Sequence, residues 1–208
     1  MAGCASPPKK VEKPSIQLPA AGATSPSIPS PSIPDKVVDV WLMPIEGFPP
    51  DYAREMEQTF SAELGLNVRT TVHAGRTQQM FGTSQQMISE RVRDELRVPV
   101  QRLYDVGPKT IIIVLTPDDL NNADSGLRFT FATHLAHEHL SIVSIARLSD
   151  TFYGGIDAPA VTKRRLYKMV KKAIGLQYYG YSRTTDLNSV MYSPIMSLDD
   201  LDIIGTSF

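Results

Sequence analysis

The segment Thr110-Ile111-Ile112-Ile113-Val114-Leu115 is the strongest structural signal in the chain. β-Branched residues dominate it, and five apolar residues follow Thr110 without interruption. Such residues favour strands, and a continuous apolar run favours a strand that is buried on both faces. The sequence therefore predicts a central strand at residues 110–115.

Weaker patterns on either side of this strand predict the elements that pack with it. Apolar or alternating runs predict strands at residues 37–43, 67–73, 127–132 and 141–148. Apolar residues at helical spacing predict helices at residues 51–64, 84–96 and 162–176. This order is typical of an α/β domain whose mixed sheet is packed by helices. We expect a single folded domain over residues 37–208.

The composition limits the class of protein. The chain has 208 residues, of which 42% are hydrophobic, enough for one core and a tail. Its net charge of -1 gives no general attraction for nucleic acid. No apolar run approaches the ~18 residues of a membrane-spanning helix. Cys4 is the only cysteine in the sequence, which excludes an internal disulfide.

The first four residues, Met1-Ala2-Gly3-Cys4, resemble a bacterial lipobox. Small residues fit the enzyme that cleaves there, and the thiol of Cys4 would carry the diacylglycerol. The earlier part of a signal peptide is missing, and we expect that it was cut away, with Met1 in place of the usual leucine. The sequence therefore predicts a lipid anchor on Cys4 in the bacterial outer membrane, on the periplasmic side.

Residues 5–36 are rich in proline. Half of the 16 prolines lie there, and Ser25–Pro29 is repeated as Ser30–Pro34. Proline is excluded from helices and central strands and favours extended polyproline II. We therefore interpret residues 1–36 as a lipidated tether, disordered or extended, that could hold the domain away from a membrane.

Six segments of the chain resemble, in order and spacing, the archaemetzincins, a family of metzincin-type zinc metallopeptidases. They are Arg76–Gln79, Ile113–Leu120, Leu127–Ala132, Val143–Leu148, Ser189–Tyr192 and Leu198–Asp202. No single segment is specific, and their shared order carries the resemblance. It implies a metzincin-like mixed sheet, with Met191 in the Met-turn beneath the site.

Active members of this family carry His-Glu-x-x-His-x-x-Gly-x-x-His, in which the histidines bind zinc and the Glu activates water. Alignment on Ile174-Gly175 gives the corresponding positions as Lys172, Ala173, Leu176 and Ser182. A register shifted by one residue gives Lys171, Lys172, Gly175 and Tyr181. Protonated lysine offers no lone pair, and alanine and leucine offer no ligand atom. The resemblance therefore implies a vestigial zinc site, no cofactor, and a pseudo-metallopeptidase that is not an enzyme. A buried lysine there would lose its proton or seek a carboxylate, and Asp186 and Asp199 are the nearest candidates in sequence.

Three histidines lie close together in the sequence at His134, His137 and His139, with Glu138 between them. Such a group could bind a transition metal. It lies in a predicted turn between two strands, and a turn that holds imidazoles loosely is more often a solvated loop. Both interpretations stay open.

Other features point to contacts with proteins. Cations on the helix at residues 162–176 predict a solvated face or a surface that docks onto an acidic partner. Four tyrosines near the expected cleft suit an interface; they are Tyr178, Tyr179, Tyr181 and Tyr192. We expect residues 143–146 to form the sheet edge that could hold an extended peptide.

These features together predict a non-catalytic lipoprotein that is a structural subunit of a bacterial envelope assembly, such as a secretion-system core complex. Its partners would be other envelope proteins, and the membrane through Cys4. Nucleic acid is not expected, because no aromatic platform interleaves the charges. Two alternatives stay open: a stand-alone periplasmic module that binds peptides or proteins, and a metal-dependent peptidase that uses the turn at residues 134–139.

Overall fold

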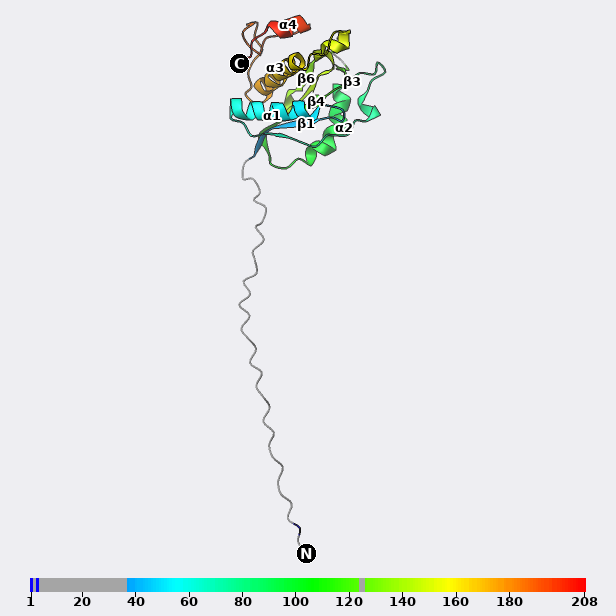
Figure 1. The fold of residues 1–208 in the computed structure, drawn as a ribbon, viewed down its shortest axis with the longest axis vertical. Helices are drawn as coiled ribbons and strands as arrows, with labels where there is room; N and C mark the ends of the chain where they lie inside the picture. The colour runs from blue at the N-terminus through cyan, green and yellow to red at the C-terminus, as the bar shows by residue number, and fades with distance from the viewer. Residues whose placement is uncertain (2, 4–36, 124–125) are drawn as a thin grey trace. The chain divides into compact units, whose positions relative to one another are not determined.

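The structure is a computed structural model that describes residues 1, 3, 37–123 and 126–208. Cys4 and the predicted tether at residues 5–36 lie outside the described residues, so lipidation and the tether stay predictions. The described part of residues 37–208 forms one α/β domain, as the sequence predicts (Figure 1). No helix in the described ranges has both the length and the hydropathy needed to cross a membrane.

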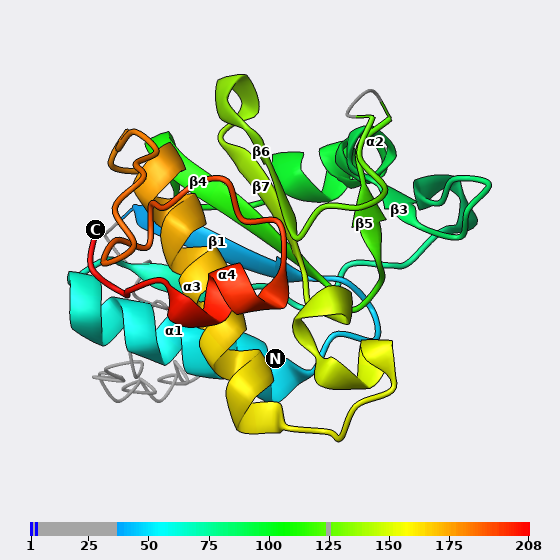
Figure 2. The same cartoon turned by 90° about the horizontal axis from the view of Figure 1, so that it is seen from above.

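A five-stranded sheet forms the centre of this domain (Figure 2). Its strands, in spatial order, are β2 (Val68–Thr70), β1 (Val38–Pro44), β4 (Val106–Thr116), β7 (Leu140–Ser144) and β6 (Ala132–Leu135). The first four run parallel to one another, and β6 is antiparallel to β7. Two short strands, β3 (Met87–Ile88) and β5 (Leu120–Asn121), pair separately.

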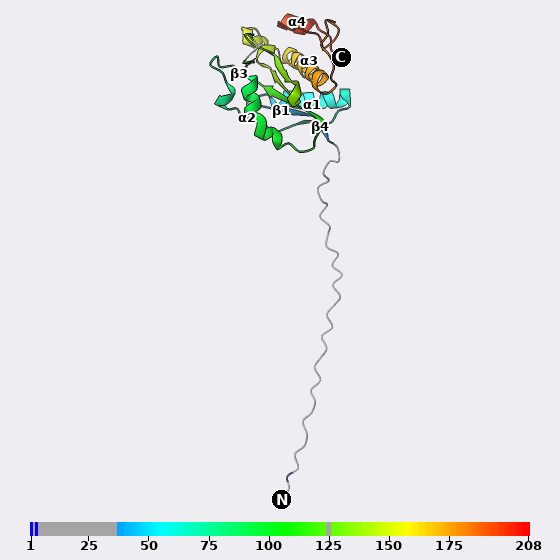
Figure 3. The same ribbon diagram turned by 180° about the vertical axis from the view of Figure 1, so that it is seen from behind.

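Helices cover both faces of the sheet. α1 (Pro50–Leu64) and α3 (Pro159–Gln177) pack on one face, and α2 (Ser89–Gln101) packs on the other (Figures 1 and 2). The short α4 (Leu198–Ile203) lies against α3 (Figure 3). Single 3-10 turns connect these elements: η1 (Gln78–Met80), η2 (Ala136–Glu138), η3 (Ala146–Leu148) and η4 (Asp150–Tyr153).

The predicted central strand is confirmed as the inner part of β4, with β1 and β7 on its two sides. Ile111, Ile113 and Leu115 belong to the core beneath α1 and α3. Ile112 and Val114 belong to the core beneath α2. Side chains of a strand alternate between its two faces, so a strand between two helical layers must be apolar throughout. That requirement explains the unbroken run.

The predicted helix at residues 84–96 begins later than its apolar pattern suggests. Gln85 has a φ of 61°, a left-handed backbone that a helix cannot contain. Met87 then pairs with Leu120 in the small sheet, and α2 starts at Ser89. Met87 is fully buried, so its apolar character serves a strand contact instead of a helical stripe.

The predicted sheet edge at residues 143–146 is wrong. β7 pairs with β4 on one side and with β6 on the other, so it lies inside the sheet. At this side of the sheet the edge strand is β6, which begins at Ala132, later than the strand predicted at residues 127–132. After η2 the chain turns back and inserts β7 next to β4, which leaves β6 outermost.

The predicted solvated face of α3 is also wrong, because four of its six cations are buried. They are Arg165, Lys168, Lys171 and Lys172. Arg165 donates two hydrogen bonds to the carboxylate of Asp202 at 2.8 and 2.6 Å, and Lys168 donates to the carbonyl oxygens of Leu201 and Ile204 at 2.9 and 2.8 Å. α4 and the chain just after it therefore cover the side of α3 that the sequence assigned to solvent (Figure 2).

Candidate functional site: a cationic pocket beside the edge strand

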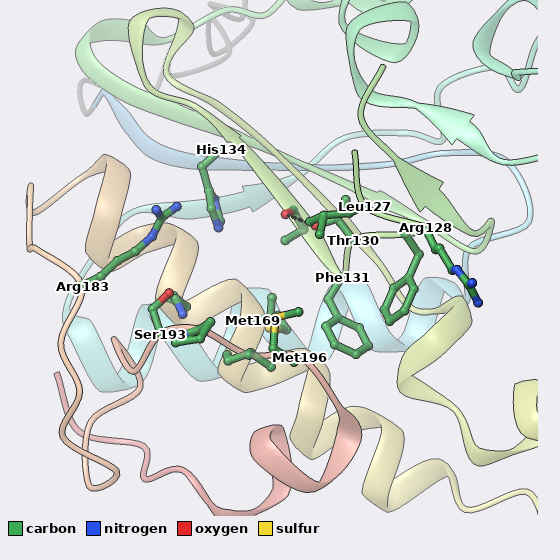
Figure 4. Close-up of a pocket in the computed structure, with 14 residues that line it drawn as sticks. Leu127, Arg128, Thr130, Phe131, His134, Met169, Arg183, Ser193 and Met196 are labelled. Atoms are coloured by element: carbon green, nitrogen blue, oxygen red, sulfur yellow. Dashed lines mark hydrogen bonds between the residues drawn. The ribbon is translucent and has the colours of Figure 1, made fainter. Parts of the chain in front are cut away.

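A pocket of about 460 Å³ lies between β6, α3 and the segment 193–196 (Figure 4). Residues 127–132 and His134 form one wall, and residues 193–196 form the opposite wall. Met169 and Lys172 contribute from α3. The position of β6 at the sheet edge is what leaves room for this pocket, since another strand would fill it.

Most of the pocket surface is apolar. Phe131 and Met169 line it and are each 5% exposed over the whole residue. The rings of Phe129 and Phe131 meet edge to face, with their centroids 5.3 Å apart. Such walls suit apolar side chains of a ligand.

Lys172 brings a cation into this apolar surrounding. The residue is 5% exposed, and its Nζ donates a hydrogen bond to the backbone oxygen of Tyr192. Burial, followed by the nearby charge of Arg183, lowers the pKa of Lys172 to about 8. The expected partners Asp186 and Asp199 are wrong, because Lys172 forms no ion pair within the described part of the chain.

His134 faces the same pocket from β6, and Arg183 extends toward it (Figure 4). The Nδ1 atom of His134 lies 2.9 Å from the hydroxyl of Ser141 on β7. Burial, then Arg183 and Lys172, lowers the pKa of His134 to about 3. The ring is therefore neutral near pH 7, and the positive charge at this end of the pocket comes from Lys172 and Arg183.

Acidic residues are absent from the pocket lining in the described structure. None of the 14 residues drawn in Figure 4 is aspartate or glutamate. The arrangement therefore offers an apolar surface with uncompensated positive charge at one end. Chemically, this suits a ligand that has an apolar body and an anionic group.

The four predicted vestigial zinc positions do not face a common point. Lys172 lines the pocket, and Ala173 is fully buried in the core against the sheet. Leu176 is half-buried, and Ser182 is exposed beside a separate pocket. In the shifted register, Lys171 forms an ion pair with Glu63 at 2.5 Å, which removes it from the site.

Met191, the predicted Met-turn residue, is 2% exposed. A Cβ atom added to Gly175 would lie 2.6 Å from the Sδ atom of Met191. Met191 therefore packs directly against α3 at Gly175, which is the last buried residue of that helix.

The histidine-rich turn is spread over two environments. His134 points into the pocket, whereas His137 and His139 are exposed on η2 and its end. Glu138 pairs with Arg93 at 3.3 Å. Within residues 37–123 and 126–208, no three side chains of the metal-binding types gather at one point.

The donor set at the cationic end does not fit the zinc ion that the family resemblance implies. A catalytic zinc takes about three nitrogen, sulfur or oxygen ligands from the protein. Around Lys172 the side chains are an ammonium, a guanidinium and a single imidazole. Two cations next to one another repel a third, so we derive no step through a metal here.

Sequence reasoning did not single out Arg183 or the segment 193–196. Neither belongs to a periodic pattern, and Arg183 lies 11 positions after Lys172 in an irregular stretch. No local signal could have found them, because only the return of the chain over α3 brings them to the pocket.

No family model matches the chain, and no curated protein matches it. Solved structures do match. A zinc-dependent peptidase from Methanocorpusculum labreanum has a TM-score of 0.67 and 22% identity, over 80% of this chain and 93% of its own. The archaemetzincin of Methanopyrus kandleri gives 0.64 and 22%, over 83% and 89%. That of Archaeoglobus fulgidus, complexed with malonate, gives 0.63 and 17%, over 81% and 94%.

These comparisons contradict the prediction that the chain is not an enzyme. The structures that share its fold are a zinc-dependent peptidase and two archaemetzincins. Nothing in the likeness marks this chain as a degenerate member of the group. The expectation drawn from the resemblance is confirmed at the level of architecture: the described domain has the fold of archaemetzincin-like zinc peptidases.

Proposed function

We propose that this chain is a lipid-anchored protein of the bacterial envelope whose domain holds an extended segment of a partner protein along β6. It would be attached by Cys4 to the outer membrane, on the periplasmic side. In this role it is a subunit of a larger envelope assembly, such as a secretion-system core complex.

The observation that carries this proposal is the edge strand beside the pocket. In the described sheet, β6 pairs with β7 and has no strand on its other side. In an antiparallel ladder, the peptide groups of every second residue point away from the neighbouring strand. An extended segment that adds to β6 would bind these groups and place alternate side chains in the pocket.

The anchor and the assembly rest on the sequence alone. Ala2-Gly3-Cys4 resembles a lipobox, and the proline repeat in residues 25–34 suits a spacer. A spacer is useful where a domain must reach a partner at a distance from a membrane. An anchor, a spacer and a binding domain in one chain support a role as a subunit, and no motif in the sequence identifies the assembly.

Site-specific photo-crosslinking in a bacterium that makes the full-length precursor tests the binding surface. A crosslinking amino acid at Met196, which lines the pocket and is 61% exposed, should trap one envelope protein. The matched control is Ile203 on α4, which is 63% exposed and does not line the pocket. Equal trapping at both positions, or none at Met196, would count against the proposal.

Purification from solubilised membranes under native conditions tests the assembly. A subunit should leave the column as a stoichiometric complex with the protein that crosslinks to Met196. Recovery of the chain only as a monomer would contradict a role as a subunit and would favour the alternative of a stand-alone binding module.

Peptide hydrolysis is the second candidate function, and the similarity in fold to a zinc-dependent peptidase and two archaemetzincins favours it. Elemental analysis and a fluorogenic peptide library test it on the same preparation. About one zinc per chain, lost in His137→Ala together with peptide turnover, would establish hydrolysis through the turn at residues 134–139.

A further inference from the structure

Two of the three cations that line the pocket, Lys172 and Arg183, lie at its His134 end. Arg183 extends toward His134, whereas Arg128 lies at the opposite end of the view (Figure 4). Lys172 and Arg183 are both close enough to His134 to lower its pKa, after the larger effect of burial. The pocket therefore has two neighbouring cations beside the last residues of β6 and a single one, Arg128, at its other end.

Lys172 differs from the other buried cations of α3 in how its charge is met. Arg165 has the carboxylates of Asp202 and Asp150 at 2.6 and 2.8 Å, and Lys171 has that of Glu63 at 2.5 Å. Lys168 has no carboxylate either, but it donates to three backbone oxygens. Lys172 donates to a single backbone oxygen, and the charge that affects its pKa is the like charge of Arg183. A buried charge is costly unless it is paired, so this end of the pocket is stabilised by an anion.

The free edge of β6 indicates the kind of molecule that would carry this anion. Strand addition satisfies the outward peptide groups of β6, which a fatty acid or a small carboxylate could not do. The C-terminus of a peptide supplies both a strand and a carboxylate. The apolar walls at Phe131 and Met169 suit the side chains of the residues that precede this carboxylate. To reach Lys172 and Arg183 with its last residue, the peptide runs parallel to β6.

We propose that the pocket recognises the free C-terminus of an apolar peptide, with Lys172 and Arg183 binding its terminal carboxylate. This inference rests on the proposed function, because it names which part of a partner is held along β6. Arg183 and Lys172 would make the pocket selective for chain ends over internal segments, because an internal segment has no terminal carboxylate.

A competition between peptide ends tests the inference on the full-length chain. The probe is an equimolar mixture of two pools of acetylated hexapeptides, randomised among alanine, valine, isoleucine and leucine, one with a free C-terminal acid and one with a C-terminal amide. The peptides that the immobilised protein retains are quantified by mass spectrometry. We expect the acid to be enriched about tenfold or more over the amide, as for a hydrogen-bonded charge.

Variants then identify the residues responsible. Arg183→Gln changes an exposed side chain, so it should fold, and it should lose most of the enrichment. Lys172→Met should lose it as well. Arg164→Gln is the matched control, because Arg164 is exposed on α3 away from this pocket, and it should keep the wild-type enrichment.

Three results would overturn the inference, and they are distinguishable. Equal retention of acid and amide by the wild type would rule out recognition of the terminal carboxylate but would still support peptide binding along β6. Retention of neither pool would contradict both the proposed peptide binding along β6 and the recognition of a C-terminus. A third pool that ends in a glutamate amide tests the source of the carboxylate. If that pool is retained as well as the acid, the pocket binds an acidic side chain and not a chain end.

Discussion

The buried cations of α3 differ in their hydrogen-bond and ion-pair partners, and these differences separate structural residues from the candidate site. Arg165 and Lys171 pair with carboxylates, and Lys168 donates to backbone oxygens near the end of α4. Lys172 alone among these four combines a single backbone partner with an opening to a pocket. A residue kept at an energetic cost in such a place is a functional candidate.

Lys172→Met should therefore stabilise the protein at pH 7. In the folded state the pKa of the Lys172 ammonium is lowered to about 8 from 10.5, which means that its burial destabilises the fold at pH 7. Methionine at this position has no charge and removes this cost. One pKa unit corresponds to about 1.4 kcal/mol, and after discounting for the open pocket and the lost hydrogen bond we expect a net gain of about 1 kcal/mol. Urea unfolding of both proteins measures it.

The pH dependence provides the check on this cause. Between about pH 8 and 10.5 the unfolded lysine keeps a proton that the folded lysine has lost. The free energy of unfolding of the wild type therefore rises with pH in that window, and the advantage of Lys172→Met shrinks. A variant that is less stable than the wild type at both pH 7 and pH 10 would contradict the assignment.

His134 should make the protein sensitive to acid. Its pKa falls from 6.5 to about 3 on folding, so the unfolded chain binds a proton in this window that the folded chain does not. The free energy of unfolding should fall as the pH decreases from 6.5 toward 3. His134→Asn should remove about 1–2 kcal/mol of the loss between pH 6.5 and 5.

The control for His134 is His137→Asn, which changes an exposed side chain on η2. Chemical denaturation at several pH values gives the slopes, and that variant should keep the wild-type slope. An NMR titration in which the His134 ring protonates between pH 5 and 8 would refute the prediction directly.

At the scale of elements, α3 is held between the sheet and the C-terminal chain. Arg165 links this helix to α4 through Asp202 and to the start of η4 through Asp150. The same guanidinium donates to the carbonyl oxygen of Leu148 at 2.8 Å. The hydrogen bond to Asp202, then that to Asp150, raises the pKa of Arg165 and keeps it charged. This residue ties three elements together beside the pocket.

Arg165→Gln should cost about 2–3 kcal/mol of stability. The variant leaves Asp202 and Asp150 without their cation, and breaking such a pair is costly where it is buried and cheaper where carboxylates reach solvent. Arg164→Gln removes the same charge from the preceding, exposed position and should cost less than about 0.5 kcal/mol. Similar denaturation midpoints for the two variants would show that the ion pairs of Arg165 with Asp202 and Asp150 contribute little to stability.

At the scale of the whole molecule, anchoring and folding are predicted to be separate. The described domain begins its core at Val38, which is fully buried, whereas Cys4 lies outside the described residues. The sequence between them is rich in proline, and Pro-rich linkers act as spacers. Loss of the anchor should therefore change where the protein is found and leave the stability of the domain unchanged.

Cys4→Ser in the full-length precursor tests this separation. The wild type should fractionate with outer membranes and gain the mass of a diacylglycerol, whereas the variant should be recovered in the periplasm. Thermal unfolding of the two proteins should give the same midpoint within error. A correctly processed wild type with an unmodified Cys4 would refute the lipid anchor.

The sequence by itself determined the α/β class, the central strand and the helices α1 and α3. These depend on local patterns, since a strand between two helical layers must be apolar at every position, as Ile111 to Leu115 are. The order of short segments was also enough to predict the archaemetzincin-like fold, because no single segment had to be specific.

Only the tertiary structure decided which strand is the edge, which lysines are buried, and that Arg183 lies beside His134. The cations of α3 were expected to be solvated because Ser189–Tyr192 and Leu198–Asp202, although they resemble family segments, do not show which face of α3 they would cover. Burial of a side chain depends on every segment that packs against it, including those far away in the sequence. The candidate site is made almost wholly of such distant contacts, so it became visible only when β6, α3 and the C-terminal segment were placed together.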